Sequence, residues 1–198
     1  MFSASAEELS IRDNYRLIHT AVAPRPIAWI STTDGNGVDN LAPYSAYNFV
    51  GSRRPVVMFS SSRKNENGDV KDTAKNIFET GEFVVNVVTE SMIEEMDHSS
   101  MALPAEESEF DRVGLERAES VRVTPPRVAD SPISMECELY DSTWIYYNLI
   151  IFGEVVHYQV DDELMTDGKV DATTLDLVGR LGGPYYTRTE FHELERQY

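Results

Sequence analysis

The strongest constraint on the fold is a long stretch in the second half of the chain where apolar and polar residues alternate. The first run consists of apolar Ile133, Met135, Cys137 and Leu139 and polar Ser134, Glu136 and Glu138. A second run continues the alternation from Ile145 to Ile151 and reaches Val155 beyond Gly153. A period of two indicates strand structure with one face buried. A strand this long usually bends, so we expect a bulge or corner at Gly153.

The rest of the chain carries shorter β-forming runs separated by turn residues. The expected strands are Ile27–Thr33, Val38–Tyr44, Pro55–Ser60 and Phe83–Val88. The segment DGNG at 34–37 is typical of a hairpin turn between the first two. About six to eight strands with few, short helices predict a mainly β protein built as a small antiparallel barrel. At 198 residues the chain is expected to form a single domain, 1–198.

Capping patterns predict where the few helices begin. The segment SAEE at 5–8 fits a capping box, and a further helical turn is expected near Tyr15–His19. Asp72 is the expected N-cap of a helix that ends at Gly81. The segment SMIE at 91–94 fits a second capping box, followed by about two helical turns.

The chain is strongly acidic, with 34 acidic and 17 basic residues and a formal charge of −17. Such a surface argues against a nucleic-acid partner, because neutralisation of phosphates by basic residues drives that binding. It is also typical of proteins from salt-loving organisms, in which screening over a Debye length of about 3 Å at 1 M salt weakens self-repulsion. We therefore expect a halophilic source; an acidic mesophilic protein is the alternative.

Composition also limits the location and the chemistry of the protein. No apolar run approaches the roughly 20 residues of a membrane span, and the N-terminus lacks the apolar core of a signal peptide. Cys137 is the only cysteine, which excludes an intramolecular disulfide and a cysteine-cluster metal site. A cytoplasmic protein without a membrane partner is expected.

One segment, from Arg53 to Lys75, reverses the charge of the chain. It contains six basic and three acidic residues, a net +3 inside a chain of −17. A local positive region is what an anionic ligand needs in a globally repulsive field. The segment includes the hydroxyls of Ser60–Ser62 and an expected helix start at Lys71, where amides and the helix dipole attract anions. This predicts a site for a phosphate-bearing cofactor, although a polar loop and an ordinary capped helix are the alternative.

Other site motifs are weak or missing from the sequence. There is no glycine-rich dinucleotide fingerprint, no P-loop and no Gly-x-Ser-x-Gly nucleophile motif. Glu94 and His98 have the spacing of metal ligands on one helix face, but a solvated role is the expected one. We therefore expect no metal site and no obligatory catalytic side chain.

Nine segments, in this order and spacing, resemble the flavin reductase-like, FMN-binding split-barrel family. They are RPIAWIST, NLAPYSAYN, PVVMFS, KDTAKN, GEFVVNVV, EFDRVGL, PPRVADSPISMECEL, GEVV and GRLGGPYY, and they extend from about Arg25 to Tyr186. The resemblance implies a split β-barrel homodimer that binds FMN near the subunit interface.

The resemblance also implies roles for particular residues. The segment expected against the flavin ring is Ala42, Pro43, Tyr44 and Ser45. The residues expected to bind the phosphate and ribityl oxygens are Ser60, Ser61, Lys71, Asp72 and Thr73. Arg63 and Arg180 are expected at the phosphate or at the subunit interface. Trp29 and Tyr185 pack either on the flavin or in the core or interface.

Two functions remain open within this family. In the first, NADH or NADPH reduces FMN, which passes electrons to a second acceptor, so that the flavin performs the chemistry. Many reductases of the family carry Gly-Asp-His for the nicotinamide, but Tyr146, Tyr147 and Asn148 occupy that place here. This departure favours the second function, an FMN-holding electron carrier that does not react with nicotinamide. A structural or interaction protein on a borrowed fold is a third possibility.

Overall fold

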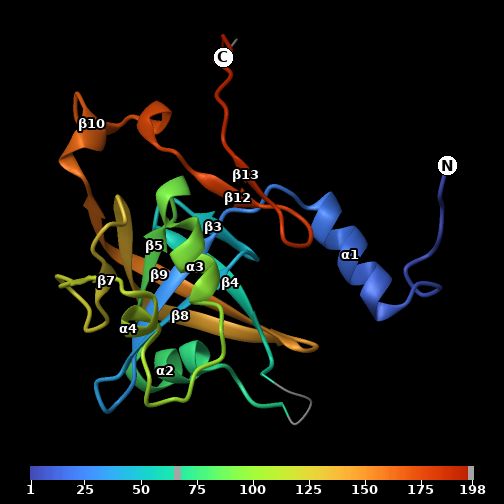
Figure 1. The fold of residues 1–198 in the computed structure, drawn as a ribbon, viewed down its shortest axis with the longest axis horizontal. Coiled ribbons are helices and arrows are strands. Elements are labelled where there is room, and N and C mark those ends of the chain that lie inside the picture. The colour runs from blue at the N-terminus through green and yellow to red at the C-terminus, as the bar shows by residue number, and fades with distance from the viewer. Residues whose placement is uncertain (65–67, 196–198) are drawn as a thin grey trace.

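The computed structural model describes residues 1–64 and 68–195, and its centre is one curved antiparallel sheet (Figure 1). The sheet has seven strands in the order β2-β1-β5-β8-β9-β4-β3. Its strands are β1 Ala28–Thr33, β2 Asp39–Tyr44, β3 Tyr47–Gly51, β4 Val56–Ser62, β5 Glu82–Val87, β8 Ile133–Ile145 and β9 Asn148–Val160. Each of the four shorter strands expected from the sequence is present within one or two residues of its expected bounds. The expected mainly β fold is therefore confirmed.

The smaller elements lie around this sheet. The helices are α1 Ile11–Ala21, α2 Asp72–Thr80, α3 Ile93–His98 and α4 Glu109–Val113, with 3-10 turns η1 Glu90–Met92, η2 Asp162–Leu164 and η3 Ala172–Thr174. The remaining strands form two-stranded ladders from β6 Arg117–Ala118 and β7 Arg127–Val128, β10 Met165–Thr166 and β11 Lys169–Val170, and β12 Val178–Arg180 and β13 Tyr186–Arg188. No helix in 1–64 or 68–195 is long and apolar enough to cross a membrane.

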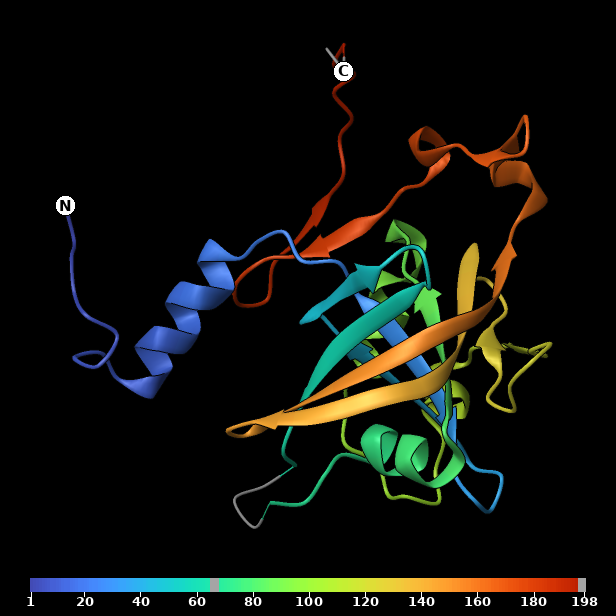
Figure 2. The ribbon, with the colours of Figure 1, turned by 180° about the vertical axis from the view of Figure 1, so that it is seen from behind.

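The two edges of the sheet, β2 and β3, are neighbours in the sequence. Only Ser45 and Ala46 separate them, and the Ser60 amide of β4 donates to the Ala46 carbonyl at 2.8 Å. The sheet thus curls until its edge strands approach each other, as the view from behind shows (Figure 2). Curvature encloses one apolar cluster and leaves a second on the outer face.

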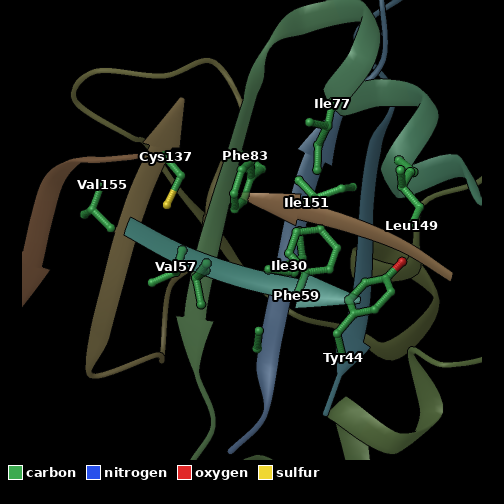
Figure 3. Packing of buried hydrophobic residues seen from close by; sticks show 13 residues of the cluster. Ile30, Tyr44, Val57, Phe59, Ile77, Phe83, Cys137, Leu149, Ile151 and Val155 are labelled. Atoms are coloured by element: carbon green, nitrogen blue, oxygen red, sulfur yellow. The ribbon is translucent and has the colours of Figure 1, made fainter. Parts of the chain in front are cut away.

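The inner cluster is built on aromatic rings from three strands. The Phe59 ring lies 4.7 Å from the Tyr44 ring and 5.7 Å from the Phe83 ring, between centroids (Figure 3). The outer cluster includes Trp29 and Phe110. Because side chains alternate across a strand, β1 serves both clusters, and all six of its residues are buried. Trp29 is therefore a core residue, and its indole donates to Ser99 Oγ at 2.9 Å.

The long alternating stretch is two strands rather than one. β8 and β9 form a hairpin that turns at Tyr146, which has a positive φ of 52°. The expectation of outward polar residues is wrong for Glu136, which is fully buried. Its carboxylate accepts hydrogen bonds from the backbone amides of Val121 at 2.8 Å and Arg122 at 2.6 Å. A loop folded over the outer face satisfies the charge, so both faces of β8 are covered there.

Gly153 does not itself form the expected bulge. The extra residue of the bulge is Tyr140 on the partner strand, since Leu139 pairs with Gly153 and Asp141 with Phe152. A Cβ atom at Gly153 would lie 2.2 Å from Cζ of Phe83. Glycine is required because the Phe83 ring of the inner cluster packs directly on the backbone of β9.

The helix starts differ from the sequence patterns, whereas the expected stop is confirmed. Residues Ser5 to Glu8 form only a turn, and Ser10 caps α1, its hydroxyl accepting from the Asp13 amide at 3.1 Å. Asp72 is not the N-cap of α2, because Lys71 occupies that position with no side-chain capping bond. Gly81 ends α2 with a φ of 77°, as expected.

The second capping box does not form at 91–94. Met92 is the N-cap of α3 and makes no side-chain capping bond. Ser91 instead pairs its hydroxyl with that of Thr89 at 3.1 Å. The helix is present, but the box is absent because Ser91 lies within η1 and not at the N-cap position of α3.

Candidate functional site

The candidate site surrounds edge strand β2, whose side chains point alternately to two hollows. Ala42 and Tyr44 line one hollow of about 210 Å³, and Pro43 and Ser45 line another of about 200 Å³. We call the first the Lys71 hollow, after the lysine at the start of α2, and the second the Arg25 hollow. Ser100 lines both, so the two hollows meet beside α3.

The Lys71 hollow contains a buried phenol whose Oη atom makes no hydrogen bond of good geometry within the described residues, although the Thr73 and Ser61 side chains lie close enough to affect its pKa. Tyr44 is 5% exposed, and neither its Oη atom nor the Oγ atom of the 2% exposed Ser61 has a partner within the described residues. Burial raises the pKa of Tyr44, while the nearby hydroxyls of Thr73 and Ser61 oppose the rise. The phenol therefore remains protonated at neutral pH and can donate. Unsatisfied buried hydroxyls are costly, which points to an oxygen-rich ligand.

The start of α2 forms the positive wall of this hollow. Lys71 Nζ lies 5.7 Å from the centroid of the Tyr44 ring. The N-cap residue Lys71 makes no side-chain capping bond, so its side chain does not occupy the amides of the first turn. Asp72 accepts from Lys64 Nζ at 3.0 Å, so these two charges neutralise each other. The uncapped amides, the helix dipole and the Lys71 ammonium together favour an anion.

A hydrogen-bonded chain joins this helix to β2. Thr73 Oγ1 donates to Asn40 Oδ1 at 2.7 Å, and Asn40 Nδ2 donates to Glu109 Oε2 at 2.7 Å. Glu109 Oε2 also accepts from the Leu41 amide at 2.9 Å. Burial raises the pKa of Glu109, while its hydrogen bonds with Leu41 and Asn40 lower it. The chain fixes the Asn40 amide and commits the Thr73 hydroxyl hydrogen to Asn40.

The Arg25 hollow is cationic. Arg25 donates from Nη1 to the His19 and Val22 carbonyls at 2.6 and 2.7 Å and from Nη2 to the Leu181 carbonyl at 3.1 Å. The backbones of Arg180 and Arg25 pair in an antiparallel β-bridge. The Arg180 guanidinium donates a hydrogen bond to the Tyr186 hydroxyl. Burial and then the charges of the two arginines lower the pKa of His19, which leaves it neutral at pH 7.

The candidate residues are divided between the two hollows and the end of β4. Ala42, Tyr44, Lys71, Asp72 and Thr73 line the Lys71 hollow, and Pro43, Ser45 and Arg180 line the Arg25 hollow. Ser61 is buried at the end of β4, beside Tyr44.

Three further candidates lie outside both hollows. The Ser60 amide is bonded to Ala46, and neither Ser60 nor Arg63 lines these two hollows. The Arg63 guanidinium lies 4.4 Å from the Trp144 ring centroid, near the tip of the β8–β9 hairpin. Tyr185 is exposed.

Sequence reasoning missed Asn40, Glu109, Arg25 and His19. The first three lie in the segments NLAPYSAYN, EFDRVGL and RPIAWIST, so their positions carried a signal without an assigned role. Glu94 and His98 are exposed on α3, and residues 1–64 and 68–195 contain no cluster of three or more potential metal ligands.

The curved antiparallel sheet with a site along its edge strand defines the class of split β-barrel proteins. Residues 20–191 match the family model described as "Flavin reductase like domain", so the chain belongs to the flavin reductase-like family. The resemblance inferred from the sequence segments is thereby confirmed.

Solved structures agree with this membership. Component B of nitrilotriacetate monooxygenase from Bacillus cereus superposes with a TM-score of 0.93 at 33% identity, covering 98% of both chains. The 2-nitrobenzoate 2-nitroreductase NbaA from Pseudomonas fluorescens has a TM-score of 0.87 at 34% identity, covering 98% of this chain and 96% of that one. A protein from Shewanella frigidimarina with a split barrel domain has a TM-score of 0.86, covers 100% of both chains and, at 24% identity, supports the fold alone.

Proposed function

We propose that this protein binds FMN along β2 and acts as an oxidoreductase, in which NADH or NADPH reduces the flavin for transfer to a second acceptor. The observation that carries the proposal is the pair of buried, unpartnered hydroxyls, Tyr44 Oη and Ser61 Oγ, beside the uncapped start of α2 and Lys71. A phosphate with its ribityl chain supplies the acceptor oxygens that this arrangement lacks.

The residues of the Lys71 hollow fit the phosphate end of FMN. Lys71 contributes charge, the first turn of α2 contributes amides, and Tyr44 contributes a hydroxyl donor. Ser61 does not line the hollow, but it is buried beside Tyr44 and is a second proposed hydroxyl donor. Thr73 contributes its amide, since its hydroxyl hydrogen is committed to Asn40. Asp72 holds Lys64 over the hollow. Ser60 and Arg63, which lie outside the hollow, remain proposed contacts from the family resemblance alone.

Strand β2 fits the ring end of the cofactor. Ala42, Pro43, Tyr44 and Ser45 are on or next to an edge strand, whose outer backbone edge pairs with no other strand of the sheet. Bound FMN would supply the electron transfer, and the chain's own residues would bind it, orient it and limit access to it. Both closely superposed proteins are named for redox systems, which supports this assignment for a chain of the same family.

We propose a homodimer as the working assembly, with Arg180 near the subunit contact. The support is helix α1, which projects from the barrel and buries none of its own residues (Figures 1 and 2). Four apolar residues lie at helical spacing on one exposed stripe, namely Ile11, Tyr15, Ile18 and Val22. A second copy of the chain is the partner that we propose for this stripe.

The cofactor assignment is tested by titrating the flavin-free protein with FMN and recording the visible spectrum. Lys71→Ala combined with Thr73→Ala should weaken FMN binding about tenfold or more, because the charge-assisted hydrogen bond of Lys71 to the phosphate is lost and the Thr73 hydroxyl no longer ties the start of α2 to Asn40. Lys75→Ala, an exposed lysine on the same helix, is the matched control at equal salt and should bind normally. Unchanged affinity in the double variant, with the fold intact by circular dichroism, would remove the phosphate assignment.

A second candidate function is an FMN-holding electron carrier. Tyr146 and Tyr147, which replace part of the nicotinamide-associated Gly-Asp-His, are 91% and 70% exposed at the tip of the β8–β9 hairpin. Stopped-flow mixing of the FMN-loaded protein with NADH and NADPH separates the two functions. Bleaching of the flavin by NADH or by NADPH supports the reductase. If neither nucleotide bleaches the flavin, the electron carrier is the remaining function.

A further inference from the structure

The Arg25 hollow lies across β2 from the proposed phosphate site, and the phosphate does not account for its charge. Arg25 is only 9% exposed, and its side chain donates to backbone carbonyls and to the Ser45 hydroxyl at 3.4 Å. No carboxylate within the described residues forms an ion pair with it. A buried guanidinium without a counter-charge is costly to the fold, so an anion entering the hollow is stabilised there.

The neighbouring charges leave the hollow positive. Arg180 Nη1 lies 3.8 Å from Asp97 Oδ1, and the same carboxylate oxygen accepts from the Tyr186 hydroxyl at 2.7 Å. Asp97 therefore offsets one of the two arginines, and His19 is neutral. Within the described residues, no hydrogen bond uses Arg180 Nη2 or Nε, so the guanidinium retains donors for a bidentate acceptor.

The other lining residues of the hollow are of mixed character. Ile27 and Met96 are buried core residues, Tyr15 and Tyr186 are aromatic, and Ser45 and Ser100 are polar. The C-terminal end of α1 and the ladder of β12 and β13 lie side by side there (Figures 1 and 2), pinned together by Arg25. A cavity of about 200 Å³ whose lining includes two arginines and two tyrosines suits a small aromatic acid.

We propose that the Arg25 hollow binds the carboxylate of a small aromatic acid, with Arg180 as the residue that recognises it. Its role as the site of the second substrate rests on the proposed function, because Pro43 and Ser45 line this hollow and also belong to the proposed ring platform. Binding of the acid itself does not require FMN. The two claims can therefore fail separately.

The test is isothermal titration of the full-length protein with benzoate and with its neutral counterpart benzamide, with and without FMN, at one fixed salt concentration. Benzoate should bind about tenfold or more tightly than benzamide, because only the acid pairs with the guanidinium. Arg180→Gln should reduce benzoate affinity about tenfold and leave benzamide unchanged. Arg188→Gln on β13, whose side chain is 76% exposed, is the control and should change neither.

Each possible result of the titrations either overturns or supports the proposed acid site. Equal affinity for benzoate and benzamide, no benzoate binding by the folded protein, or an unchanged Arg180→Gln variant would overturn the proposal. Loss of both benzoate and FMN in Arg180→Gln would also overturn it, because Arg180 would then serve the flavin. Benzoate selectivity in a protein that never binds FMN would support the hollow and remove the proposed function. Arg25 is left intact, since it holds the end of α1.

Discussion

At the scale of single residues, Glu109 connects the two parts of the proposed cofactor site. Its carboxylate accepts a hydrogen bond from the Leu41 amide of β2. It also accepts one from Asn40, which in turn accepts from Thr73 at the start of α2. Glu109 lies 69 residues from Asn40 in the sequence and is 7% exposed. A buried acceptor with two donors holds strand and helix in register, and the arrangement depends on hydrogen bonding more than on charge.

Two substitutions separate these contributions of Glu109. Glu109→Ala should lower the free energy of unfolding by roughly 1–3 kcal/mol, because the Asn40 and Leu41 donors lose their acceptor. Glu109→Gln keeps an acceptor oxygen and removes the buried charge. Urea denaturation of both variants measures these changes, and Glu107→Gln, an exposed neighbour, is the control.

The raised pKa of Glu109 predicts that the stabilities of the wild type and of Glu109→Gln depend differently on pH. A carboxyl whose pKa rises on folding stabilises the fold below its ordinary pKa of 4.5 and loses that contribution as pH rises through the folded value. The wild type should therefore lose stability relative to Glu109→Gln as pH increases from about 4 to 7. Parallel pH profiles for the two proteins would contradict this assignment.

At the scale of elements, helix α1 is the part of the chain whose structure its own residues explain least. Ser10 caps it and Arg25 holds its last carbonyls, yet none of its residues is buried. An isolated helix of 11 residues is marginal in water, so packing against another surface must supply its stability. The exposed stripe from Ile11 to Val22 is the surface available for that packing.

The contact of α1 with a second copy is tested by Ile18→Glu. Ile18 is 61% exposed at the centre of the stripe, and a carboxylate there should raise the dimer dissociation constant about tenfold or more, measured by analytical ultracentrifugation. Arg16→Gln changes the net charge by the same amount away from the stripe and is the control. A monomeric wild type, or equal dissociation constants for both variants, would contradict the proposed dimer.

At the scale of the whole molecule, the charge of −17 is the dominant property. The ion pairs of the described residues are mostly exposed, such as Arg16 with Asp13, and contribute little individually. Repulsion among acidic side chains therefore opposes the compact state at low ionic strength. The Arg25 hollow, lined by two arginines and one aspartate, is a local exception in this field.

The proposed halophilic character predicts that added salt stabilises the protein. The free energy of unfolding should rise between 0.1 and 2 M NaCl, because the Debye length shortens from about 10 Å to below about 3 Å. The increase should shrink in a variant with three exposed acids neutralised, Glu106→Gln, Glu163→Gln and Glu190→Gln. Thermal melts across the salt series measure both, and full stability in low-salt buffer would contradict the prediction.

The sequence by itself determined four strands of the sheet, one helix end and the family. Period-two alternation and turn residues are local properties, and they located β1, β2, β4 and β5 within one or two residues. Gly81 ends α2 as expected, because a position with a left-handed backbone conformation favours glycine whatever surrounds it. The quoted segments carried the family membership, which the match over residues 20–191 confirms.

Only the tertiary structure decided where charges and hydroxyls find partners. Glu136 reads as an outward residue, but the loop at 121–123 covers it. Asp72 reads as a cap, but Lys64 holds its carboxylate. Adjacent candidates such as Ala42 and Pro43 face different hollows because strand neighbours point to opposite sides. Periodicity is set by neighbours in the chain, whereas a polar group takes whichever partner long-range packing brings within hydrogen-bond distance.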